Sequence, residues 1–172
     1  FLYAGMLVHR AKIARVNHLI DATPIPNWTL LFSKVIALIK MQVVLLAVIM
    51  IAGIIFQVYN GYYNFEFGHY LQELFLLSIL GYVVWAFLSI FIQTLIGNPY
   101  LGLFILLVIS IGMPFLSLAG VEQSIFKYNQ GPGFSYSDMN GYGILTPFLV
   151  YKAYWILCGL LLSVMSALFW VR

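Results

Sequence analysis

Charged side chains are scarce in this chain. Its 172 residues include eight Lys and Arg and five Asp and Glu, so 8% of the sequence is charged, whereas soluble domains carry roughly 25%. Hydrophobic residues make up 63%, which is more apolar surface than one soluble core of this size could cover. The single cysteine, Cys158, excludes a disulfide within the sequence. The composition therefore excludes an ordinary soluble domain and indicates a membrane protein.

The sequence also lacks the motifs of several chemistries. It contains neither a Gly-x-x-x-x-Gly-Lys-Ser/Thr loop for nucleotide phosphates nor a His-Glu-x-x-His zinc motif. It has no Ser/His/Asp set at one depth, no series of buried acids for proton transfer and no basic patch of the kind that binds nucleic acid. We therefore expect this segment to have no catalytic residue, no metal, no cofactor and no nucleic-acid partner.

Four long apolar runs are the main feature that is present. They cover approximately residues 32–58, 71–96, 99–119 and 147–171. A helix rises about 1.5 Å per residue, so about 20 apolar residues cross a hydrocarbon core of ~30 Å. The runs are continuous rather than alternating, which favours helices over a barrel. The predicted fold is an all-α polytopic bundle, with a transmembrane region of four helices in 32–172 and a cytoplasmic amphipathic helix in 1–31.

Basic and acidic residues separate onto the two sides of these four predicted spans. Lys and Arg accumulate on the cytoplasmic side of membrane proteins, so the basic side is predicted to be cytoplasmic. The loop 120–146, rich in turn formers, is then extracytoplasmic, together with Lys127 and, near the membrane, Lys152. The basic side carries Arg10, Lys12, Arg15, Lys34, Lys40 and Arg172, and the other side carries Glu66, Glu73, Glu122 and Asp138.

The segment before the first run is amphipathic and basic. A helix over 5–21 is predicted to lie in or under the cytoplasmic interface, and two prolines end it at an elbow. Its predicted apolar face carries Met6, Ile13, Val16 and Ile20, and its predicted polar face carries His9, Lys12 and Arg15. Candidate contacts with lipid headgroups or a partner are Lys12, Arg15, Asp21, Thr23, Pro24 and Pro26.

Small residues recur every four positions in the fourth run, at Gly159, Ser163 and Ala167. Small side chains at this spacing let another helix approach closely, so these three residues are predicted to face a neighbouring helix. In the third run, Pro114 predicts either a kink or the end of the helix, with 115–119 then lying along the outer interface. The sequence leaves these two alternatives open.

Aromatic side chains crowd the first outer loop. Tyr and Trp favour headgroup depth because one end is apolar and the other forms hydrogen bonds. This favours an anchoring role, and an aromatic cage that binds a ligand is the alternative. The aromatic residues of this loop are Tyr59, Tyr62, Tyr63, Phe65, Phe67 and Tyr70.

The order of elements resembles the permease subunits of type-2 ABC transporters. The matching stretch runs from Leu7 to Pro26 and is followed by Ser33-Lys34 at the start of a membrane helix. The resemblance implies that the amphipathic segment transmits the motion of a separate ATPase to the spans. The sequence departs from the family pattern by lacking its acidic residues and its Gly-Thr pair.

A narrower resemblance covers nearly the whole chain. Three motifs are similar to bacterial permeases that are fused to a gluzincin aminopeptidase domain. This resemblance implies that the chain is a fragment holding spans two to five of a six-span unit of the bacterial inner membrane, with the peptidase beyond Arg172. The motifs are Tyr3-Ala4-Gly5-x-Leu7-Val8, Ile20-Asp21-Ala22-Thr23-Pro24-Ile25-Pro26-Asn27-Trp28 and Tyr136-Ser137-Asp138-Met139-Asn140-Gly141-Tyr142-Gly143.

Two functions follow from these resemblances. The first is a permease segment that moves a substrate with the help of a separate ABC ATPase, alongside other helices of a longer protein or a second permease half. The alternative is a membrane anchor or structural subunit with a permease-like fold, which holds an extracytoplasmic peptidase domain or partner proteins. The order of elements favours transport, and the missing acidic and Gly-Thr positions favour the anchor.

Overall fold

The computed structural model describes residues 1–15, 26–137, 139 and 141–170. Within them the chain is helical, and the only extended pairing is an isolated bridge between Ser137 and Gly141. The elements in order are α1 (Leu2–Ile13), α3 (Asn27–Tyr59), α4 (Phe67–Tyr70), the π-helix η1 (Leu71–Ser78), α5 (Ile79–Leu95), α6 (Pro99–Phe115), the 3₁₀ turn η2 (Ser124–Phe126) and α7 (Thr146–Phe169). The predicted all-α class is confirmed.

Three helices in the described part are long and apolar enough to cross a membrane. They are α3 with 33 residues, the continuous helix Phe67–Leu95 with 29 residues, and α7 with 24 residues. At about 1.5 Å per residue even the shortest is ~36 Å long, more than the ~30 Å hydrocarbon core. These helices agree with the first, second and fourth runs of the sequence. They support a multi-pass membrane protein.

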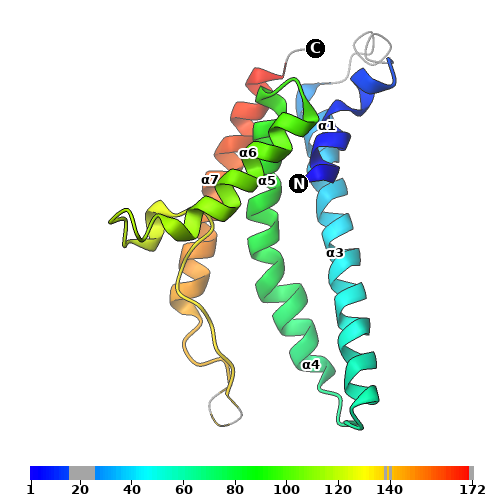
Figure 1. Cartoon of the computed structure of the whole chain (residues 1–172), viewed down its shortest axis with the longest axis vertical. Coiled ribbons are helices and arrows are strands. Elements are labelled where there is room, and N and C mark those ends of the chain that lie inside the picture. The colour runs from blue at the N-terminus through cyan, green and yellow to red at the C-terminus, as the bar shows by residue number, and fades with distance from the viewer. Residues whose placement is uncertain (16–25, 138, 140, 171–172) are drawn as a thin grey trace.

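The third run forms a shorter helix than predicted. α6 has 17 residues, about 25 Å, and carries Pro114 in its last turn. Proline removes the backbone hydrogen bond to the carbonyl oxygen four residues earlier and so weakens this last turn. The helix ends at Phe115, directly after Pro114, rather than bending and going on. Figure 1 shows α6 running obliquely away from α5 and α7. Four long helices were predicted, and three helices of the described chain are long enough to cross a membrane. Of the two alternatives for Pro114, a kink or a helix end, the structure shows the helix end.

The N-terminal helix is packed into the bundle. α1 contacts α3, α5 and α6, and Figure 1 shows it at the end of the bundle where α3 begins. The ring of Phe1 lies 5.4 Å from that of Trp85, centroid to centroid. Trp85 precedes the end of α5 at Leu95 by ten residues, about 15 Å along the axis. The N-terminal end of α1 therefore lies beside α5, about 15 Å from the end of that helix.

One residue of α1 lies on a different face from the one predicted. His9, expected on the polar face, is only 5% exposed, whereas Met6 and Ile13, expected on the apolar face, are 56% and 66% exposed, as side chains that face lipid would be. The buried face instead begins with Ala4 and Gly5. These residues are small, so the backbone of α1 can lie directly against α5. Helical periodicity alone could not predict which face of α1 is buried, because that face is determined by contact with another helix, α5.

Gln93 of α5 joins three helices. Its side chain is completely buried and donates from Nε2 to the carbonyl oxygen of Pro99 at 3.3 Å. A Cβ added to Gly5 of α1 would lie 2.9 Å from Nε2, and one added to Gly102 of α6 would lie 2.5 Å from Oε1. Both glycines are therefore needed for the amide to fit. α1, α5 and α6 meet at this one polar side chain.

α5 and α7 form the most extensive contact between two helices of the described chain. Gly159, Ser163 and Ala167 of α7 are all buried. A Cβ on Gly159 would lie 2.6 Å from Cδ2 of Phe87 on α5. The structure thus places the small-residue repeat on the buried face of α7, with Gly159 directly against α5.

Larger side chains on this face should weaken the bundle. We expect Gly159→Leu and Ser163→Leu each to lower the free energy of unfolding by about 1–3 kcal/mol, as overpacking does, and to reduce the melting temperature in detergent. Val164→Leu is the matched control, because Val164 is 40% exposed on the same helix. Melting of Ser163→Leu at the wild-type temperature would show that the small residues are not needed for close packing.

Candidate functional site

A short non-helical segment enters the bundle between α5 and α7. We call Lys127–Gln130 the inserted segment; Figure 1 shows the yellow chain that contains it returning from the end of α6 toward α7. It bonds to Gly81, the central residue of the 29-residue helix Phe67–Leu95. The sequence predicted a loop of successive turns outside the spans for 120–146. In the structure the inserted segment lies beside the middle of the helix Phe67–Leu95.

Tyr128 connects the inserted segment to three helices. Its hydroxyl donates to the carbonyl oxygen of Val84 on α5 at 2.7 Å, and its backbone N–H donates to Sδ of Met113 on α6 at 3.3 Å. Its ring packs edge-to-face between Trp85 of α5 and Trp155 of α7, at centroid distances of 5.3 and 4.9 Å. Such aromatic pairs add roughly 0.5–1.5 kcal/mol each beyond their burial. Tyr128 therefore holds the inserted segment in the bundle through both hydrogen bonds and ring packing.

Asn129 connects the segment to a lysine inside α7. Lys152 donates from Nζ to both the backbone oxygen and Oδ1 of Asn129, at 3.0 and 2.7 Å. Asn129 in turn donates from Nδ2 to the carbonyl oxygen of Gly81 at 3.1 Å. Its φ of 60° places it in the left-handed region, which Asn tolerates better than most residues. The turn thus presents two oxygens to one ammonium group.

Lys127, in the inserted segment itself, is a second cation of the site and is buried, whereas Lys152 of α7 is half-buried. It is 7% exposed, and its Nζ donates to Oγ of Ser117 at 2.7 Å. Across the part of the chain that the structure describes, neither Lys127 nor Lys152 pairs with a carboxylate. Burying a charge without a counter-ion is costly, so neutral oxygens alone balance these two groups. The site therefore has an excess of positive charge.

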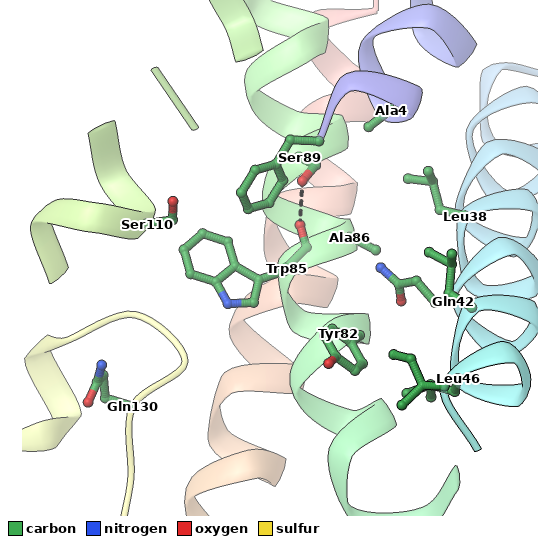
Figure 2. Close-up of a pocket in the computed structure, with 13 residues that line it drawn as sticks. Ala4, Leu38, Gln42, Leu46, Tyr82, Trp85, Ala86, Ser89, Ser110 and Gln130 are labelled. Atoms are coloured by element: carbon green, nitrogen blue, oxygen red, sulfur yellow. Dashed lines mark hydrogen bonds between the residues drawn. The ribbon is translucent and has the colours of Figure 1, made fainter. Parts of the chain in front are cut away.

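A cavity of about 590 Å³ lies next to the inserted segment. Figure 2 shows Gln42 extending from α3 toward α5, with Trp85 and Gln130 on the other side of α5. The amide oxygen Oε1 of Gln42 is buried and has no hydrogen-bond partner among the described residues. Polar groups from Gln42, Ser89 and Gln130 thus face a largely apolar cavity. It has the chemistry to hold an apolar body with a few hydrogen-bonding groups.

The predicted contact residues are only partly described. Lys12 belongs to the last turn of α1, Arg15 is exposed with a φ of 56°, and Pro26 is the exposed residue that precedes α3. Asp21, Thr23 and Pro24 lie outside the described residues. Lys34 donates from Nζ to the carbonyl oxygen of Val8 at 3.2 Å and lies 3.9 Å from the ring centroid of Trp170. A side chain of α3 therefore joins α1 to the end of α7.

The site offers groups that can bind a ligand. In the described part, no three His, Cys, Asp or Glu residues are placed to hold a metal ion. The polar groups of the inserted segment are amides, hydroxyls and ammonium groups, which can form hydrogen bonds and attract negative charge. Comparisons of the chain with protein families, curated proteins and solved structures find no match.

Removing the Asn129 side chain should destabilise the bundle. Asn129→Ala leaves Lys152 with one fewer acceptor and Gly81 without the side-chain donor, which costs about 1–3 kcal/mol for buried groups. We expect a lower melting temperature in detergent. Gln123→Ala is the control, because Gln123 is exposed and its side chain caps no helix. Equal melting of the two variants would contradict a structural role for the inserted segment.

Proposed function

We propose that the chain is a membrane-spanning segment of a type-2 ABC transporter permease, which moves a substrate with energy from a separate ATPase. The observation that carries the proposal is the inserted segment. Non-helical backbone at membrane depth is tolerated only where it is buried in protein or lines a water-filled cavity. Transporters build their central sites from such interrupted elements.

The two lysines of the site, buried Lys127 and half-buried Lys152, support the same proposal. A charge inside a membrane is expensive and is retained mainly along pathways for substrates or ions. Lys127 and Lys152 lie in or against the inserted segment without a carboxylate partner among the described residues. A simple anchor has no need of this arrangement, because continuous apolar helices would hold it in the membrane at lower cost. Transport is therefore favoured over anchoring.

Charge placement supports an orientation in the bacterial inner membrane. The end of the bundle formed by α1 and the start of α3 carries Arg10, Arg15 and Lys34. The helix Phe67–Leu95 begins at the other end, where Glu66 and Glu73 lie. Because basic residues stay in the cytoplasm, we place α1 on the cytoplasmic side. In this proposal α6 and the irregular chain after it together make the third of four crossings.

The N-terminal segment is proposed to couple an ATPase to this site. Lys12, Arg15, Asp21, Thr23, Pro24 and Pro26 are the proposed contacts with the ATPase or with lipid headgroups. Lys34 holds the carbonyl oxygen of Val8, so α1 and α3 are joined by a hydrogen bond. α1 also reaches Gln93 and Trp85 of α5. A displacement of the segment would therefore be passed to the helix that holds the inserted segment.

The proposed orientation can be measured by cysteine labelling in cells. Cysteines at Asn60 and Ser135 are expected to react with a membrane-impermeant maleimide added outside the inner membrane, since both residues are exposed at the proposed outer side. A cysteine at Asn98, in the proposed cytoplasmic turn before α6, should react only after permeabilisation. Cys158→Ala provides the background. Labelling of Asn98→Cys from outside would overturn the orientation.

Coupling can be tested by crosslinking the full-length protein. Asp21→Cys, on the proposed coupling segment, is expected to crosslink to a co-purifying nucleotide-binding protein, whereas Asn60→Cys at the proposed outer side should not. If both variants insert normally and no nucleotide-binding partner is recovered in mild detergent, the anchor function replaces transport. The recovered chain would also show whether a peptidase domain is attached.

A further inference from the structure

The cavity beside the inserted segment is enclosed by several helices, and we call it the central cavity. Figure 2 shows α3 on one side of α5, and Ser110 of α6 and Gln130 on the other side. Phe1 and Ala4, at the start of the chain, complete the lining. Its volume of about 590 Å³ falls within the range of roughly 300–1,000 Å³ that is typical of pockets for small molecules.

The lining of the central cavity changes from buried to exposed residues. Leu46 of α3 and Ala86 of α5 are buried beneath the cavity, whereas Leu45 and Ile49 of α3 are exposed along its rim. Leucine and isoleucine side chains favour hydrocarbon over water. The opening is therefore apolar, and it suits a molecule that enters from the interior of a bilayer.

The described side chains that line the central cavity are uncharged. None of them is Asp, Glu, Lys, Arg or His. One lining residue, Gln42, lies close to the middle of α3, which has 33 residues, so the cavity is far from both ends of this helix. A charged ligand would need a counter-ion at that depth, because an unpaired charge in an apolar environment is costly. The cavity therefore suits an uncharged ligand.

Gln42 supplies a hydrogen-bond donor to the central cavity. Its amide extends from α3 toward α5, with the nitrogen on the side of α5 (Figure 2). The amide forms no hydrogen bond within the described chain, and of its two polar atoms only Oε1 is buried. Nε2 therefore keeps accessible surface in a largely apolar cavity, where an N–H group without an acceptor is costly. A ligand with an oxygen acceptor would satisfy this donor.

We propose that the central cavity binds an uncharged, lipid-soluble molecule of the class of long-chain alcohols. The apolar lining holds the alkyl chain, and Nε2 of Gln42 donates to the hydroxyl oxygen. An alkane has no acceptor and would leave this donor unsatisfied, whereas an alkylammonium ion would bring a charge without a counter-ion. The proposal does not depend on the proposed transport function, so failure to find an ATPase partner would leave it standing.

The test is photolabelling of the full-length protein in phosphatidylcholine nanodiscs. The probe is 1-decanol with a diazirine in its chain, and mass spectrometry identifies the labelled peptides. We expect label on the parts of α3 and α5 that line the central cavity, and we expect unlabelled 1-decanol to displace it. Decane should compete about three- to tenfold more weakly, as loss of one neutral hydrogen bond would. Decyltrimethylammonium should compete more weakly still, because it carries a charge.

Variants on α3 separate the hydrogen bond from the fold. Gln42→Leu should remove the preference for decanol over decane, whereas Gln57→Leu, the same change on the same helix outside the central cavity, should keep it. Leu45→Trp, at the exposed rim, should reduce decanol labelling several-fold and keep the preference. It provides the comparison if Gln42→Leu melts below the wild-type temperature.

Three results would overturn the proposal. The first is label that decanol does not displace or that spreads evenly over the exposed apolar faces of the helices. The second is an unchanged preference for decanol in a stable Gln42→Leu variant. The third is labelling of Leu45→Trp at the wild-type level.

Discussion

Peptide groups in hydrocarbon have no water to bond with, and the whole arrangement of this chain depends on that constraint. Helices satisfy it within one segment, which is why α3, Phe67–Leu95 and α7 are long and continuous. Where the helical ladder is interrupted, other groups must replace it. The indole of Trp155 donates to the carbonyl oxygen of Gln130 at 3.0 Å, and the N–H of Gln130 donates to the carbonyl oxygen of Lys127. The inserted segment is therefore stable only because α5 and α7 surround it.

Polar side chains perform a related task where helices meet. Gln93 sits between Gly5 and Gly102, and its amide has room only because both positions lack a Cβ. Ser89 and Ser166 are also buried, and each donates its hydroxyl to a carbonyl oxygen four residues earlier in its own helix. These bonds keep the hydroxyls satisfied without a partner on another helix. Buried polar side chains in the bundle are thus accommodated either by a shared amide, as at Gln93, or by bonds within their own helix, as at Ser89 and Ser166.

The sequence predicted the helices well because run length and apolar content are local properties. It also identified Gly159, Ser163 and Ala167, whose four-residue spacing does not depend on the identity of the neighbour, and the structure buries all three. It missed the burial of His9, because the face of α1 is chosen by Gly5 against Gln93. It also missed the inserted segment. By sequence alone, the segment Lys127–Gln130 resembles an exposed polar loop. Its hydrogen-bond partners, Gly81, Val84 and Lys152, are distant in the sequence and become neighbours only in the folded chain.

The position of the inserted segment sets an order for biosynthesis. Its partners on α5 are made before it, but Trp155 is made 25 residues after Gln130. At a synthesis rate of about 5–20 residues per second, that interval is about 1–5 s. During it the carbonyl oxygen of Gln130 and the oxygens of Asn129 lack their donors on α7, so hydrocarbon is a poor place for them. The inserted segment therefore acquires its full set of hydrogen bonds only after α7 has been made, and until then its stability depends on the partners from α5 and α6 alone.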